Sequence, residues 1–134
     1  MSEDIYKETI LDHFRHPRNF GELPNANARA REANVVCGDV IEMQLRVDGD
    51  KVEDVRFQGQ GCAISLASAS KLTEFSKGKS VSEIKQLGKR DMIRVLGSDP
   101  GVARVECLLL GLKVLKIAIR NHLGDKASSE IEED

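Results

Sequence analysis

The chain has 134 residues, of which 40% are hydrophobic and 31% charged, and its formal net charge is −2. This length suits one domain with its own core, and the composition is that of a folded globular protein, not of a disordered chain. The slightly acidic charge argues against nucleic-acid binding, which usually requires a basic face. No run of about eighteen apolar residues is present, so we expect no membrane-spanning helix. Met1-Ser2-Glu3-Asp4 is acidic and precedes no apolar signal region, so we expect a cytoplasmic protein.

The first part of the chain predicts one helix followed by a polar excursion. Residues 4–15 carry apolar side chains, Ile10 among them, near one helical face, and His16-Pro17 ends this helix. Residues 23–34 are polar and small. We therefore expect a surface excursion or an irregular edge strand there.

Three strands are expected next. Val40–Val47 alternates apolar and polar residues, which predicts a half-buried strand. Asp48-Gly49-Asp50 predicts a hairpin turn, after which Val52–Phe57 returns antiparallel. An earlier strand near Ala30–Val36 is expected to pair with them.

The second half of the chain predicts helices. Cys62–Phe75 is rich in small residues, and Lys77-Gly78-Lys79 ends it. Ser80, three residues before Glu83, predicts a capping box at the start of a short helix. Residues 89–101 are interpreted as a connector, and the last long helix is expected from Val102 to His122.

The order of these elements indicates an α+β fold with a small antiparallel three-stranded sheet and helices packed on one face. We find no internal repeat and no sign of a second domain. Residues 1–127 are therefore expected to form one domain. The acidic residues 128–134 are expected to be a disordered tail.

The three cysteines, Cys37, Cys62 and Cys107, are expected at the ends of elements. Three is an odd number, and a reducing cytosol disfavours structural disulfides. None belongs to a CxxC pair, so the spacing of a zinc finger is absent. Cys62 follows two glycines and opens a helix, where the dipole favours the thiolate that binds metals or attacks sulfur. Buried thiols, redox chemistry and metal binding all remain open.

Two features favour a metal site. Asp39 lies two residues beyond Cys37, and three thiolates with one carboxylate would complete a tetrahedral zinc or iron site. Glycines beside Cys37 and Cys62 would let backbone N–H groups approach sulfur. From the residues alone, a shared metal site and inert thiols are equally supported. The three histidines have no paired ligand in the sequence and are interpreted as surface or capping residues: His13, His16 and His122.

Three motifs in order carry a resemblance: Cys37-Gly38-Asp39, Gly61-Cys62-Ala63-Ile64-Ser65 and Arg104-Val105-Glu106-Cys107. With the opening stretch from Tyr6 to Gly21, they make the chain resemble the IscU/SufU/NifU N-terminal scaffold proteins of iron–sulfur cluster assembly. The resemblance covers about Tyr6 to His122.

This resemblance implies a scaffold rather than an enzyme. A transient [2Fe-2S] cluster would be built from iron and from the persulfide sulfur of a cysteine desulfurase, then passed to recipient apoproteins. The implied ligands are Cys37, Asp39, Cys62 and Cys107, with Asp39 as the labile fourth ligand. Cys107 or Cys62 would accept the persulfide. Arg104 favours Cys107 for this role, and Glu106 opposes it. A homo-oligomer is possible, and no nucleic acid or membrane is implied.

The sequence also departs from the family pattern. Glu106 stands where IscU members usually carry a histidine, and Pro100-Gly101-Val102-Ala103-Arg104 replaces their Leu-Pro-Pro-Val-Lys chaperone segment. The motif letters resemble SufU, which gives a second hypothesis: a zinc-dependent sulfurtransferase that holds zinc on the same four ligands. Zinc is also a possible occupant of the scaffold in its cluster-free form. However, Cys62 and Cys107 are too close in sequence to hold the SufU insertion. A structural zinc or thiol domain is the third hypothesis.

Overall fold

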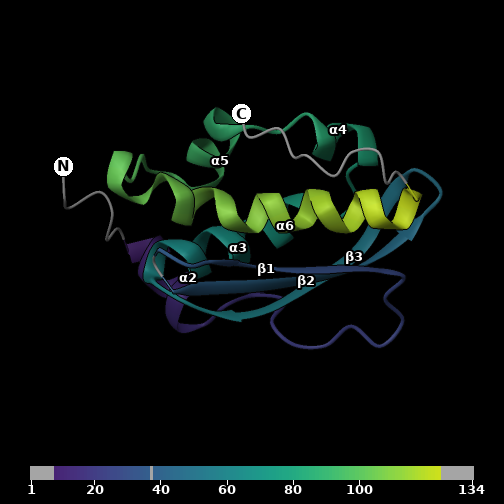
Figure 1. Cartoon of the computed structure of the whole chain (residues 1–134), viewed down its shortest axis with the longest axis horizontal. Helices are drawn as coiled ribbons and strands as arrows, with labels where there is room; N and C mark the ends of the chain where they lie inside the picture. The colour runs from purple at the N-terminus through teal and green to yellow at the C-terminus, as the bar shows by residue number, and fades with distance from the viewer. Residues whose placement is uncertain (1–7, 37, 125–134) are drawn as a thin grey trace.

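The computed structural model describes residues 8–36 and 38–124 and shows a three-stranded antiparallel sheet covered on one face by helices (Figure 1). The predicted α+β fold class is confirmed. The elements in chain order are α2 (Glu8–Arg15), β1 (Ala28–Asn34), β2 (Asp39–Asp48), β3 (Lys51–Gln60), α3 (Ala63–Ser76), α4 (Val81–Lys85), α5 (Lys89–Leu96), the 3-10 turn η1 (Val102–Arg104) and α6 (Val105–Leu123).

The strands follow one another in space as β1-β2-β3, and both pairings are antiparallel. Gly49 has a φ of +62°, which a tight two-residue hairpin turn between β2 and β3 requires. Apolar residues alternate along β2, so one face of the sheet can be buried against the helices. On that face the side chains of Ile41, Met43 and Leu45 are fully buried.

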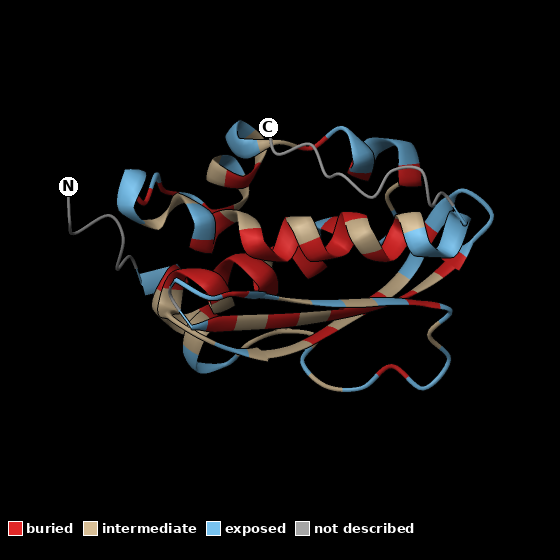
Figure 2. Ribbon diagram, viewed as in Figure 1, coloured by how far each residue is buried: buried red, intermediate tan, exposed pale blue. Residues whose placement is uncertain are grey.

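Helices α3 and α6 form the layer above the sheet (Figure 2). α6 packs on β1 and β2, α3 packs on β3, and the two helices pack against each other. Small residues allow this close approach, because a Cβ added to Gly111 would lie 3.4 Å from the Cα of Ala69. The small-residue composition of α3 thus serves helix packing. α2 packs on α3, and α5 packs on both α3 and α6.

The opposite face of the sheet is partly covered by the segment 16–27, which runs below the strands in Figure 1. The backbone N–H of Leu23 donates to Oε1 of Gln44 at 2.8 Å, and Arg56 donates to the carbonyl of Glu22 at 3.0 Å. Gln44 is therefore buried, although it lies on the polar face of its strand.

Several boundaries differ from the predictions. The first strand is Ala28–Asn34 and not Ala30–Val36, because Val35 and Val36 turn away from the sheet and are 87% and 84% exposed. β3 continues to Gln60, three residues beyond its predicted end. The predicted capping box of α4 is confirmed. Residues 1–7 and the predicted tail at 128–134 lie outside the described residues.

The connector predicted for residues 89–101 is wrong, because α5 occupies most of it. The backbone N–H of Gly88 donates to Asp91 at 2.8 Å, and Gly97 ends the helix in the left-handed conformation. Met92 and Leu96, four residues apart, bury one face of α5 in the core. These signals are visible in the sequence, but the helix is too short for a clear periodicity.

Of the surface or capping role predicted for His13, the surface role is wrong, since the residue is only 8% exposed and packs between α2 and α3. His13 Nδ1 lies 2.7 Å from the hydroxyl of Ser70, which also accepts a hydrogen bond from the backbone N–H of Arg18 at 2.9 Å. Burial lowers the pKa of His13 below its ordinary value of 6.5, and the charge of Arg18 lowers it further, although Glu74 opposes the shift. His16 and His122 are exposed, as predicted.

The lowered pKa of His13 predicts a loss of stability in mild acid. Below about pH 6.5 the unfolded chain binds a proton at His13 before the folded chain does, so the free energy of unfolding falls as the pH falls. Urea unfolding between about pH 7.5 and 5 should show this slope. His13→Asn, which keeps an acceptor for Ser70, should flatten it, whereas His16→Asn should not. Equal slopes in all three proteins would contradict the assignment.

Candidate metal centre

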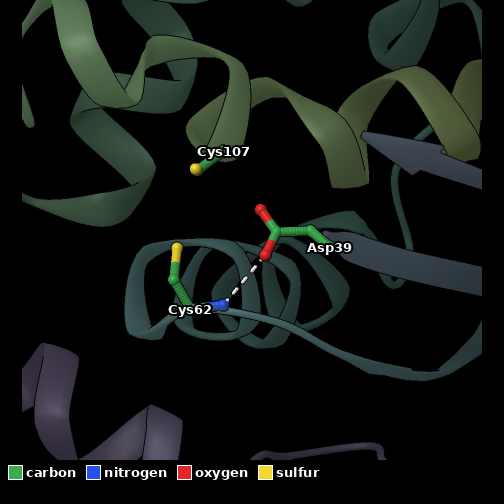
Figure 3. Close-up of side chains that lie close together, drawn as sticks. All are labelled: Asp39, Cys62 and Cys107. Atoms are coloured by element: carbon green, nitrogen blue, oxygen red, sulfur yellow. Dashed lines mark hydrogen bonds between the residues drawn. The ribbon is translucent and has the colours of Figure 1, made fainter. Parts of the chain in front are cut away.

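Three side chains with metal-binding atoms meet above the sheet, each from a different element (Figure 3). Asp39 is the first residue of β2, Cys62 immediately precedes α3, and Cys107 lies in the first turn of α6. A carboxylate oxygen of Asp39 and the Sγ atoms of both cysteines all lie within 4.8 Å of one another. The structure therefore brings together three of the four residues that the sequence singled out.

The fourth, Cys37, lies outside the described residues, but its chain neighbours are placed. It follows the exposed Val36 and directly precedes Gly38, whose N–H donates to the carbonyl of Asn34 at 2.8 Å. This hydrogen bond links the end of β1 to the residue that precedes Asp39.

The Asp39 carboxylate is fully buried and is held by the start of α3. Its Oδ1 accepts the backbone N–H of Cys62 at 3.0 Å, and its Oδ2 accepts the hydroxyl of Ser65 at 2.6 Å. α3 has no acidic residue in its first turn, and the side chain of Cys62 makes no capping hydrogen bond. Asp39 therefore supplies from β2 the negative charge that a helix N-terminus favours.

Gly59 and Gly61, which precede Cys62, must be glycine because their backbone packs closely against the first residues of β2. A Cβ on Gly61 would overlap Oδ1 of Asp39 and lie 2.8 Å from its Cγ. A Cβ on Gly59 would overlap the carbonyl oxygen of Val40, on the strand paired with it. The backbone at Gly59 and Gly61 therefore approaches β2 closely. However, the N–H of Cys62 points to Asp39, whereas the sequence suggested that such groups approach sulfur.

The two cysteines differ in access. Cys62 is partly exposed, whereas Cys107 is 2% exposed in the core between α6 and its neighbours. Glu106, directly before Cys107, is exposed.

Comparison with known proteins identifies the family. Residues 5–129 match the model of the NifU-like N terminal domain. The chain belongs to this family. The IscU scaffold protein for iron–sulfur cluster assembly from Aquifex aeolicus is 39% identical over 120 residues, which cover 88% of this chain and 76% of that protein. The zinc-dependent sulfurtransferase SufU of Bacillus subtilis is 33% identical, over 91% of this chain and 94% of SufU.

A solved structure agrees with these sequence matches. A protein described as a scaffold for iron–sulfur cluster assembly in the SUF system, from Fervidobacterium islandicum, superposes with a TM-score of 0.77 at 32% identity. The match covers 89% of this chain and 99% of that protein. This NifU-like domain thus belongs to the iron–sulfur cluster assembly proteins that include IscU and SufU. No helix among its described residues is long and apolar enough to cross a membrane.

The donor set of the NifU-like domain suits a thiophilic metal. Thiolate ligands select zinc and iron–sulfur clusters over hard cations such as magnesium, and a carboxylate can complete either kind of site. Two thiolates on one tetrahedral zinc ion lie about 3.8 Å apart, given Zn–S distances of about 2.3 Å. In this structure the ligand atoms lie within 4.8 Å of one another, so a small movement of the side chains would bring the two sulfur atoms to that distance.

One residue of the site was not singled out from the sequence. Ser65 contacts both Asp39 and Cys62, with its hydroxyl oxygen 3.6 Å from the Cys62 Sγ. Its position three residues after Cys62, close to one helical turn, was the available signal. Its contact with Asp39 joins residues 26 positions apart, which no local pattern predicts.

The packing of Gly61 against Asp39 predicts that Gly61→Ala destabilises the protein by about 1–3 kcal/mol, because the added methyl group displaces the carboxylate or the backbone. Chemical denaturation of the metal-free protein measures this loss. In an Asp39→Ala background the same substitution should cost less, since the overlapping atoms are gone while backbone strain is common to both backgrounds. Equal costs in the two backgrounds would contradict the steric explanation.

Proposed function

We propose that this chain is a scaffold on which a [2Fe-2S] cluster is assembled and from which it is transferred to apoproteins. The ligands in this proposal are Cys37, Asp39, Cys62 and Cys107. The observation that carries it is the meeting of Asp39, Cys62 and Cys107 within 4.8 Å, with Cys37 two residues before Asp39. Family membership supports the same chemistry.

The donor set suits a cargo that must leave. Cysteine thiolates hold iron–sulfur clusters, whereas a carboxylate is a harder and weaker partner for the cluster than a fourth thiolate. Asp39 is also engaged by two hydrogen bonds from α3, so it has stable partners when no cluster is present. A site of this kind keeps its buried carboxylate hydrogen-bonded after the cluster departs.

Sulfur must reach the site as persulfide, for which a cysteine desulfurase is the proposed donor. The acceptor in this proposal is Cys62 or Cys107. Cys62 is partly exposed at the N-terminus of a 14-residue helix. Cys107 has Arg104 three residues before it but is almost completely buried. Its greater solvent exposure therefore favours Cys62 as the persulfide acceptor, with Cys107 as the alternative.

A second candidate function is a zinc-dependent sulfurtransferase, with zinc held by the same four residues. The match to SufU, which covers 94% of that protein, favours it. The alignment spans 139 positions, more than the 134 residues of this chain, so SufU contains residues with no counterpart here. We therefore place the scaffold first.

Metal content tests the scaffold proposal. We expect the full chain, purified anaerobically, to bind iron and acid-labile sulfide in equal amounts when incubated with a cysteine desulfurase, cysteine, iron and a reductant. Replacement of Cys37, Cys62 or Cys107 by serine should prevent this. Mass spectrometry before iron is added should show which cysteine carries the extra sulfur. Zinc that remains bound throughout, without cluster formation, would support the sulfurtransferase and contradict the scaffold.

The proposal that Asp39 is the labile ligand leads to a separate prediction. Asp39→Ala should hold a reconstituted cluster several-fold longer in air, as followed by its visible absorption, because the ligand that favours release is gone. Glu42→Ala, which removes a carboxylate farther along the same strand, is the control and should leave the lifetime unchanged. Faster loss of the cluster from Asp39→Ala would show that Asp39 only supports it.

A further inference from the structure

The hydroxyl of Ser65 lies between two proposed ligands. Ser65 Oγ is 2.6 Å from Oδ2 of Asp39 and 3.6 Å from Sγ of Cys62, and the residue is fully buried. A hydroxyl has one proton, and an ionised carboxylate can only accept. The short distance to Asp39 therefore assigns the proton of Ser65 to that carboxylate.

The two carboxylate oxygens of Asp39 are thus held by the same helix. The N–H of Cys62 holds Oδ1 and the hydroxyl of Ser65 holds Oδ2, so rotation of the carboxylate about its Cβ–Cγ bond would break both contacts. Hydrogen bonds to an ionised acceptor are roughly twice as strong as neutral ones. Because Cys62 is itself the N-cap of α3, the carboxylate and the backbone of Cys62 are fixed relative to each other before any metal arrives.

We propose that Ser65 is a positioning residue of the metal site, acting through Asp39. The inference rests on the proposed function, because it assumes that Asp39 and Cys62 bind the metal. Without the hydroxyl, Asp39 keeps a single hydrogen bond and can turn away from the position in which it meets metal. Hydrogen-bond partners of metal ligands typically contribute 10- to 100-fold to metal affinity.

α3 provides a matched control. Ser68, one turn after Ser65, is also fully buried, but its hydroxyl has no hydrogen-bond partner within residues 8–36 and 38–124. Ser68→Ala therefore makes the same chemical change in the same helix without touching Asp39. Any general effect of removing a buried hydroxyl from α3 appears in both variants.

The experiment measures zinc affinity of the full chain under anaerobic conditions, by competition with a chromophoric chelator. We expect Ser65→Ala to weaken zinc binding by about 10-fold or more and Ser68→Ala to leave it unchanged. In an Asp39→Ala background, Ser65→Ala should have no further effect, because the residue through which it acts is missing. The visible bands of bound Co²⁺ add a spectroscopic readout: Ser65→Ala should shift them toward those of Asp39→Ala.

Three results would overturn the inference: unchanged zinc affinity in Ser65→Ala, tighter binding, or the same loss with and without Asp39. If Ser65→Ala lowers the thermal midpoint too far for the titration, Ser65→Thr replaces it. Threonine keeps the hydroxyl, so normal affinity and normal Co²⁺ bands are expected, and altered bands in a folded Ser65→Thr protein would count against the inference. If replacement of Cys37, Cys62 and Cys107 by serine leaves the zinc affinity unchanged, the proposed function itself is refuted.

Discussion

The hydrogen bond from the Cys62 N–H to the Asp39 carboxylate joins the sheet to the helical layer at the site. It connects the first residue of β2 to the first turn of α3, although 22 residues separate them in sequence. Gly61 must be glycine because this carboxylate occupies the space of its Cβ. The fold and the candidate metal site therefore share one contact, so a substitution that disturbs this contact affects both.

Asp39 thus has a structural role and a proposed role as a ligand, and both use the same carboxylate oxygens. As a buried carboxylate it needs hydrogen bonds, since an unpartnered buried charge is costly. In its proposed role as a ligand it would offer lone pairs to metal. The two demands are compatible because each carboxylate oxygen has more than one lone pair. The protein can therefore be stable without cargo while its donor atoms remain in place.

Much of this arrangement could be predicted from the sequence, for reasons that differ by element. β2 was predictable because apolar and polar residues alternate regularly along it. The hairpin was predictable because Asp48-Gly49-Asp50 is typical of a tight turn between two strands. α5 was missed since eight residues hold only two buried positions. His13 was misjudged because the partner that buries it, Ser70, lies 57 residues away. The motifs named Asp39, Cys62 and Cys107, which the structure brings close together, whereas only the three-dimensional contact with Asp39 singled out Ser65.

The close packing of α3 and α6 has a consequence for metal selection. Ala69 and Gly111 are in contact where these helices meet, and each lies on the same helix as one cysteine of the site. The separation of the two helices therefore influences the gap between the sulfur atoms of Cys62 and Cys107. A bulkier side chain at this crossing would widen that gap without altering any ligand. Chains with identical ligand motifs can thus differ in the size of the inorganic group they hold, and that difference is encoded in the volume of the hydrophobic core.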